Sequence, residues 1–436
     1  MSRLARAEGS ARILALVKLA NVGFVLIWGF AVTYVFVRIL PIAEFQAFLL
    51  LVAFGNFTIS AEFGLTSIIY ARLRRYWLGA EDADESGFRL EEMGLLFLFL
   101  GLLIVGAIAV LLVALAAGWL GTAMPLLFLL FFLSACLNLP ALLAKRALAA
   151  IDGNFLWEAL DCSRRVVTIA LLIAILHGLD AHLSVALQLA VSALVIGYAI
   201  LTVHRRLGMT MRHWLAFRTG GGHVRRHYLR DIGASAAFTA SDIVAYNAPY
   251  FTIALATSDA RPMLIFDFFF KMSRALSMMV RAMVEAALPR ITRAHHATDT
   301  VRLRQLLLRA TAAALLFAFG LSIALLIGGP WLFERLFDGR AAIGLWDIIL
   351  IDAALLALSL LCVSVYVQAA LGRFAFLLRR SLPFLAGSLL SVPIAMALLP
   401  DSFDSAVIGL YALTLVLVSA AHAIALRNVT QGRVRP

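Results

Sequence analysis

The 436-residue chain is 63% apolar and only 14% charged, with a mean hydropathy of +0.96. Soluble globular proteins are about 45–50% apolar and about 25% charged, so this composition excludes an ordinary water-soluble enzyme and a disordered protein. Continuous apolar runs such as residues 95–117 also exclude an outer-membrane barrel, whose strands are short alternating segments. We therefore expect an all-α polytopic membrane protein.

Segments of low charge predict twelve transmembrane helices, each long enough for a bilayer core of about 30 Å. In chain order they lie at residues 13–37, 45–70, 93–117, 123–145, 155–177, 182–203, 231–256, 263–288, 306–329, 345–370, 377–399 and 405–426. The first apolar run continues past residue 35 without a cleavage site, so we expect this helix to remain in the protein.

The predicted helices divide into two six-helix bundles, residues 1–203 and 231–436. Residues 204–230 between them form the longest basic segment and include the glycine run 220–222, which is typical of a flexible linker. Within this segment, residues 209–217 predict a short helix that lies at the membrane interface.

The placement of the 37 lysines and arginines sets the expected orientation. On the face that holds both termini, 28 of them lie in loops or at helix ends, whereas the other face holds only 4, namely Arg38, Arg261, Arg335 and Arg340. Because basic loops stay on the cytoplasmic side, both termini are expected in the cytoplasm.

The five remaining cations lie inside predicted membrane spans. They are Arg164, Arg165, Lys271, Arg274 and Arg281. A charge at the bilayer centre costs about 2.5–3.5 kcal/mol, so such a side chain normally faces a water-filled cavity or an oppositely charged partner. These residues carry the functional argument.

The eighth predicted helix has a polar stripe in which successive residues are separated by three or four positions. Its members are Asp267, Lys271, Arg274, Met278, Arg281 and Glu285. They share one helix face over about 27 Å. One interpretation is a ladder of intrahelical pairs, Asp267 with Lys271 and Arg281 with Glu285. This ladder leaves Arg274 without an acidic partner at those spacings, so we favour a water-filled lumen lined by cations.

The fifth predicted helix carries a second charged cluster, comprising Glu158, Asp161, Arg164, Arg165 and Thr168. A structural ion pair between Asp161 and Arg165 and a substrate contact through the arginines are both consistent with the spacing.

The seventh predicted helix has a milder polar stripe, comprising Ser235, Thr239, Asp242, Tyr246 and Tyr250. Such residues more often form interhelical hydrogen bonds than line a cavity. Glu62 and Asp352 are isolated acids within predicted spans, and each could be the partner of an arginine or a relay for protons or sodium. With Asp242 and Asp267, they are the candidates for ion coupling.

No nucleotide-binding motif is present, and neither a metal site nor a cofactor is expected. His223 and His227 are four residues apart in an arginine-rich loop without other metal-ligating residues, so they do not predict a zinc site. The periplasmic loops are too short to hold a soluble catalytic site.

Three segments resemble a known transporter family. Residues 35–48, VFVRILPIAEFQAF, are similar to the first loop of polysaccharide exporters, and residues 60–72, SAEFGLTSIIYAR, to the end of their second helix. Residues 267–290, ending in AALPR, resemble their eighth helix. The chain therefore resembles Wzx-type O-antigen or exopolysaccharide flippases of the multidrug/oligosaccharidyl-lipid/polysaccharide exporter (MOP) superfamily.

This resemblance implies two bundles around a central cavity that opens to alternate sides of the membrane. It further implies a monomeric transporter of the bacterial inner membrane that is not an enzyme and does not bind nucleic acid. Its substrate would be an undecaprenyl-diphosphate-linked oligosaccharide, and its partners a polysaccharide polymerase and glycosyltransferases. Arg274, Arg281 and Lys271 would bind the diphosphate, with Arg38 and Arg72 near the cavity mouths. Glu62 departs from the family pattern, in which an aspartate is more frequent.

Three other functions compete with this one. A drug or cation antiporter of the same superfamily would line its cavity with acids, but the first predicted helix has none. A lipid II flippase usually has fourteen helices. A membrane glycosyltransferase or O-antigen ligase, from a different functional class, would need a large periplasmic loop or a soluble catalytic domain.

Overall fold

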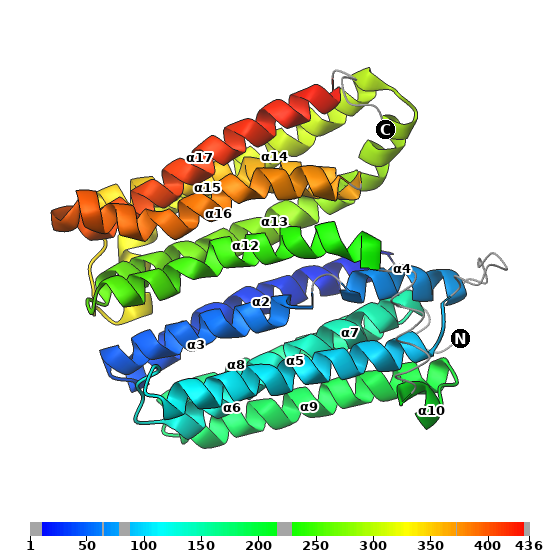
Figure 1. The fold of residues 1–436 in the computed structure, drawn as a ribbon, viewed down its shortest axis with the longest axis horizontal. Helices are drawn as coiled ribbons and strands as arrows, with labels where there is room; N and C mark the ends of the chain where they lie inside the picture. The colour runs from blue at the N-terminus through cyan, green and yellow to red at the C-terminus, as the bar shows by residue number, and fades with distance from the viewer. Residues whose placement is uncertain (1–10, 63–64, 78–87, 216–228, 372, 431–436) are drawn as a thin grey trace. The chain divides into compact units, whose positions relative to one another are not determined.

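The computed structural model describes residues 11–62, 65–77, 88–215, 229–371 and 373–430, and the regular structure in these segments is helical (Figure 1). The glycine run 220–222, His223 and His227 lie outside the described residues. The chain divides into two compact units, one formed by residues 1–39 and 50–239 and the other by residues 40–49 and 240–436. Each unit is described by itself.

The helices of the first unit are α2 (Ala11–Ile39), α4 (Leu65–Trp77), α5 (Glu91–Ala116), α6 (Pro125–Cys136), α7 (Asn138–Ala150), α8 (Asn154–Leu176), α9 (Ala181–Arg206) and α10 (Met211–Trp214). The second unit holds α13 (Arg261–His296), α14 (Thr300–Phe337), α15 (Leu345–Ala370), α16 (Phe374–Leu398), a 3-10 turn η1 (Pro400–Ser402) and α17 (Phe403–Thr430). Two helices, α3 (Ile42–Ser60) and α12 (Leu229–Ala256), pass from one unit into the other.

Each of the twelve predicted spans coincides with a helix or with a pair of consecutive helices. Nine spans in the described part of the chain are long and apolar enough to cross a membrane. The other three predicted spans correspond to α8, α12 and α13, which are long enough but less apolar. These three helices carry the charged cluster and the two polar stripes predicted from the sequence. The same polar side chains that form the candidate site therefore lower the hydropathy of these spans.

The fourth predicted span is interrupted at Leu137, where α6 ends and α7 begins. Proline has no backbone N–H and its ring disturbs the preceding helical turn. Pro140 therefore cannot donate to the carbonyl of Cys136, four residues earlier. The Asn138 side chain instead donates to the Ala135 carbonyl at 2.9 Å, which satisfies one of the acceptors left free by the interruption.

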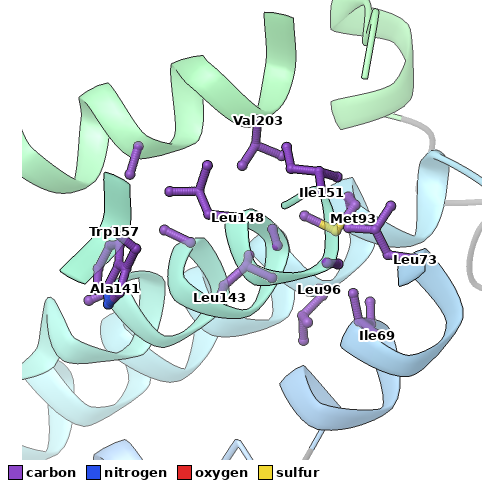
Figure 2. Close-up of a cluster of buried hydrophobic side chains, with 14 of the residues drawn as sticks. Ile69, Leu73, Met93, Leu96, Ala141, Leu143, Leu148, Ile151, Trp157 and Val203 are labelled. Carbon is purple, nitrogen blue, oxygen red and sulfur yellow. The ribbon is translucent and has the colours of Figure 1, made fainter. Parts of the chain in front are cut away.

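The core of the first unit is an apolar cluster supplied by five helices (Figure 2). Each of the five helices contributes at least one side chain that is at most 3% exposed, namely Leu73 of α4, Met93 of α5, Leu148 of α7, Trp157 of α8 and Val203 of α9. Because these residues lie near the end of α4, α7 and α9 and near the start of α5 and α8, the cluster packs one end of the bundle.

The short loop between α8 and α9 lies outside the membrane spans and begins α9 with an acidic cap. The Asp180 carboxylate accepts a 2.9 Å hydrogen bond from the backbone N–H of Leu183. This hydrogen bond lowers the pKa of the Asp180 carboxyl, so the cap is complete at neutral pH and is lost as the pH falls through that lowered value.

In the second unit, α15 is the central helix and packs against α13, α14, α16 and α17. Aromatic side chains fill the space where α13 meets α16 and α17. The ring of Tyr411 on α17 lies 5.6 Å from that of Phe266, 5.3 Å from that of Phe269 and 5.6 Å from that of Phe384. Such edge-on arrangements give a rigid packing of large side chains.

A buried charged network joins α8 to α2 and α7 in the first unit. The Asn21 amide of α2 donates to Glu158 at 2.6 Å and to Asp161 at 3.0 Å, and both acceptors are on α8. Arg164 donates to Asp161 at 2.6 and 3.0 Å, and Arg165 donates to it at 3.1 Å.

Lys145 of α7 lies 3.8 Å from the second oxygen of Glu158 and completes this network. Asn21, Glu158, Asp161 and Arg164 are each at most 7% exposed. A buried charge of this kind is tolerated only when it is paired and hydrogen-bonded. The geometry therefore makes the α8 charges an internal connection between helices.

We predict that Asp161→Ala strongly destabilises the first unit. The substitution leaves Arg164 and Arg165 without their shared carboxylate, and removal of one partner from a buried ion pair costs about 3–5 kcal/mol. Thermal unfolding of the detergent-solubilised protein measures the effect.

The matched control is Asp180→Ala, which removes an exposed carboxylate from the same unit. Its effect on thermal unfolding should be much smaller. Arg165→Gln should be less harmful than Asp161→Ala, because Arg164 still neutralises the carboxylate. Equal unfolding temperatures for the two aspartate variants would contradict a connecting role for the network.

Candidate functional site

The predicted polar stripe lies on α13 in the second unit, and its first pair is formed. Asp267 is 1% exposed and makes an ion pair with Lys271 one turn later. Tyr250 of α12 donates a 2.8 Å hydrogen bond to the other oxygen of the Asp267 carboxylate. Lys271 is therefore held by an acid that a neighbouring helix also fixes.

The second pair of the stripe is formed as well. The Arg281 guanidinium donates to Glu285 at 2.7 Å, and about half of each side chain is exposed. The Arg281 guanidinium carbon also lies 5.9 Å from the ring centroid of Tyr366 on α15. In contrast to the Asp267–Lys271 pair, this pair is accessible to solvent or a ligand.

Arg274 lies between the two pairs and differs from both. Its side chain is exposed, and among the described residues it forms no hydrogen bond or ion pair. Its guanidinium carbon lies 5.8 Å from the ring centroid of Phe270. Asp242 and Tyr250 of α12 are near enough to feel its charge.

Further polar side chains of α12 and α15 surround this part of α13. Cys362 of α15 donates through its sulfur to the Ser277 hydroxyl of α13 at 3.5 Å. Tyr366 lies in electrostatic range of Asp242 and Arg281. We call the set Asp242, Asp267, Lys271, Arg274, Ser277, Arg281, Glu285, Cys362 and Tyr366 the α13 polar face.

Sequence reasoning identified the charged members of the α13 polar face but missed Ser277, Cys362 and Tyr366. A single serine, cysteine or tyrosine in an apolar helix carries no periodic signal. Cys362 and Tyr366 lie opposite α13 because α15 packs against it, which only the fold provides.

Helix α12 is connected to its neighbours through Tyr250 of the predicted stripe and through residues outside it. Besides the Tyr250–Asp267 hydrogen bond, Ser381 of α16 donates to Ser241 at 3.1 Å, and Tyr411 of α17 donates to the Ala245 carbonyl at 3.3 Å. Ser241 is not part of the predicted stripe. The side chain of Ser235, which is part of it, lies outside the described residues.

The other basic candidates have partners close in sequence or in the same unit. Arg38 donates to the Tyr34 carbonyl at 2.7 Å and lies over the Tyr34 ring. Arg72 of α4 pairs with the buried Glu92 of α5 at 3.1 Å. Arg164 and Arg165 belong to the buried network of the first unit. All four lie in the first unit, whereas the α13 polar face belongs to the second.

The two isolated acids have different surroundings. The Glu62 carboxylate accepts from the backbone N–H of Thr66 at 2.9 Å and so caps the beginning of α4. Asp352 of α15 is 6% exposed and has Ser322 of α14 as a polar neighbour. Within the described residues, neither oxygen of Asp352 has a hydrogen-bond partner, and no group of three metal-ligating side chains is found.

No protein-family model matches the sequence, and no curated protein matches it. Solved structures do match over nearly the whole chain. An inward-facing multidrug resistance MATE family transporter of the MOP superfamily is 14% identical, with a TM-score of 0.67, and the match covers 96% of this chain and 100% of that one.

Two further solved structures belong to the same group. A mutant of the Vibrio cholerae MATE transporter VcmN is 15% identical, with a TM-score of 0.61 and 96% of each chain covered. The eukaryotic MATE transporter AtDTX14 is 12% identical, with a TM-score of 0.64, and the match covers 97% of this chain and 98% of that one. These identities show the fold alone. The predicted all-helical, MOP-exporter-like fold is thus confirmed, and the protein is a multi-pass membrane protein.

Proposed function

We propose that the protein is a transporter that moves an undecaprenyl-diphosphate-linked oligosaccharide from the cytoplasmic to the periplasmic leaflet of the bacterial inner membrane. The observation that carries this proposal is Arg274, an exposed guanidinium that has no hydrogen-bond or ion-pair partner in the described part of the chain. It lies near the middle of the predicted span 263–288.

An arginine in this position fits an anionic ligand. Its guanidinium offers five N–H donors in a planar fork, and it stays protonated at any physiological pH. Two of these donors can bind two oxygens of a phosphate at once. A diphosphate cannot cross hydrocarbon unaided, so a charged group of this kind near mid-membrane lowers the barrier where it is highest.

The neighbouring cations support Arg274 to different extents. Arg281 is half exposed beside Glu285, so it can turn toward an anion while its carboxylate partner remains hydrated. Lys271 is nearly buried by its pair with Asp267 and its side chain is only 14% exposed. We therefore rank Arg274 first, Arg281 second and Lys271 third as ligands of the diphosphate.

A second candidate function is a MATE-like antiporter of drugs or other organic cations. The fold similarity to multidrug MATE transporters favours it. Asp242, in electrostatic range of Arg274, would then be the group that attracts a cation. The two functions differ in the sign of the charge that the α13 polar face must bind.

For the flippase, Arg274→Ala should reduce transport by about 10- to 100-fold, since a hydrogen bond to a charged group contributes about 1.5–3 kcal/mol. Arg274→Lys should recover part of the loss, because it keeps the charge and loses the fork. The measurement is movement of a fluorescent undecaprenyl-diphosphate-linked oligosaccharide across proteoliposomes that contain the purified protein.

The control is Arg293→Ala, which removes an exposed arginine from the same helix beyond the α13 polar face. It should transport at the normal rate. Normal transport by Arg274→Ala at equal protein content would refute the assignment of Arg274 to the diphosphate. Failure of the unaltered protein to move any lipid-linked glycan would refute the flippase.

A second prediction distinguishes the two functions, because one substitution should have opposite effects on an anionic and on a cationic substrate. Asp242→Asn removes a negative charge beside Arg274 without changing the shape of the side chain. For an anionic substrate, this change should tighten binding by about two- to fivefold, since surface-type charge interactions contribute up to about 1 kcal/mol. Binding is measured by titration of the purified protein with undecaprenyl diphosphate.

For an organic cation, the same Asp242→Asn substitution should abolish uptake, which is measured with a fluorescent cationic dye in the same proteoliposomes. Weaker binding of undecaprenyl diphosphate together with loss of dye transport would favour the antiporter. Ser241→Ala, next to Asp242 but uncharged, is the control for local disturbance of α12.

A further inference from the structure

An apolar groove in the first unit is lined by residues of α5, α9 and α10. Figure 1 shows α10 directly after α9 in the first unit. The volume of the groove is about 580 Å³. Both α5 and α9 are membrane spans, and each contributes residues at steps of three and four to one face of the groove. The principal lining residues are Gly94, Phe97 and Gly101 of α5 and Gly197, Leu201 and His204 of α9.

Glycines keep the groove open along its length. A Cβ atom added at Gly101 or at Gly197 would find no protein atom within 4 Å. Phe97 and Leu201, which flank these positions, are 41% and 43% exposed. The seven helical steps from Gly94 to Gly101 span about 10 Å, which is most of one leaflet of hydrocarbon. In a membrane this space must be filled by a hydrocarbon chain.

The end of the groove at α10 is fixed rather than open. A Cβ atom at Gly94 would collide with the His213 carbonyl oxygen and lie 2.7 Å from the Cα atom of Trp214, so α10 rests directly on the backbone of α5. The Trp214 ring packs against Phe97 with centroids 5.4 Å apart.

The polar edge of Trp214 faces the end of α9. Its indole N–H donates to Nδ1 of His204 at 3.1 Å. Because an indole nitrogen can only donate, Nδ1 is the acceptor and the neutral imidazole carries its proton on Nε2. The groove therefore ends in an N–H donor beside an aromatic residue of the type that lies at the level of lipid head groups.

Two exposed arginines are the sequence neighbours of residues that line this end, Arg205 beside His204 and Arg212 beside Met211. Arg205 closes α9 and Arg212 lies in α10, and both side chains are exposed. The nearby acid Glu92 at the start of α5 is buried and neutralised by Arg72. The groove thus combines an apolar channel of one-leaflet length with a cationic, hydrogen-bonding end, which is complementary to an anionic lipid.

We propose that this groove is a binding site for an anionic phospholipid, with one acyl chain between α5 and α9 and the phosphate at Arg205, Arg212 and His204. In the predicted orientation the lipid lies in the cytoplasmic leaflet. Phospholipid is favoured over the longer polyprenyl chain because the residues of α5 that line the groove span only about 10 Å, which is within one leaflet of hydrocarbon. The proposal is independent of the transported substrate.

The test uses the full-length protein in phosphatidylcholine nanodiscs that contain a minority of phosphatidylglycerol. Bromine atoms on the acyl chains of either lipid quench nearby tryptophans. The chain has seven tryptophans, so the signal of Trp214 is the difference between the unaltered protein and Trp214→Phe. Brominated phosphatidylglycerol should quench this signal several times more than brominated phosphatidylcholine at equal mole fraction.

Three variants separate the groove from its charges. Gly197→Leu and Gly101→Leu, on opposite walls, place a side chain in the groove from a position where the added Cβ atom has no protein atom within 4 Å, and each should remove the preferential quenching. Arg205→Gln and Arg212→Gln should each reduce the preference for phosphatidylglycerol by about fivefold.

The matched control is Gly106→Leu, since Gly106 is an exposed position of α5 with equally open surroundings outside the groove. It should leave the quenching unchanged. Equal quenching by the two lipids, or a preference that survives both Gly101→Leu and Gly197→Leu, would overturn the proposal. Displacement of phosphatidylglycerol by equimolar undecaprenyl phosphate would overturn it in favour of a polyprenyl site. None of these outcomes bears on Arg274 or on glycan transport.

Discussion

An ionised side chain inside a membrane must be paired or reach water, and this constraint organises both units of the protein. In the first unit, Asp161 accepts hydrogen bonds from two arginines and an asparagine within 3.1 Å, and the side chain of Arg165, the most exposed of the four residues, is only 18% exposed. In the second unit, Lys271 and Arg281 each take an acid from their own helix, whereas Arg274 is exposed. The first unit therefore uses its charges internally, and the second keeps one accessible.

The same constraint divides the helices into two kinds. The apolar spans, such as α5 and α9, satisfy their backbone internally and can present their surface to lipid. The spans that carry charge, α8 and α13, need partners from other helices, such as Asn21 for α8 and Tyr250 for α13. A helix of the second kind is held at specific contacts, so its register relative to its neighbours is defined by hydrogen bonds as well as by packing.

The sequence could predict those features that depend on residues close along the chain. The twelve spans follow from apolar length, and the Asp267–Lys271 and Arg281–Glu285 pairs follow from helical spacing. The partners Asn21 and Lys145 could not be predicted, because their contacts with α8 depend on how α2 and α7 pack. Glu62 was misleading for a similar reason. The chain leaves its helix after Ser60, so this acid caps α4 instead of lying within a continuous span.

Asp352 and Arg274 are two ionisable residues of the second unit with different surroundings, and the difference bears on the charge of the transported substrate. Asp352 is 6% exposed and has Ser322 as a polar neighbour. Arg274 is exposed and cannot lose its proton. A buried acid can adapt to the membrane by giving up its charge, but arginine cannot. Arg274 has Asp242 in electrostatic range but no ion-pair partner in the described part of the chain, so compensation of its charge is left largely to water or to an anion. Water can do this at rest, and a phosphate does it better because it also matches the guanidinium geometry. The asymmetry between these two residues is the physical reason to expect an anionic cargo on a fold that it shares with multidrug MATE transporters.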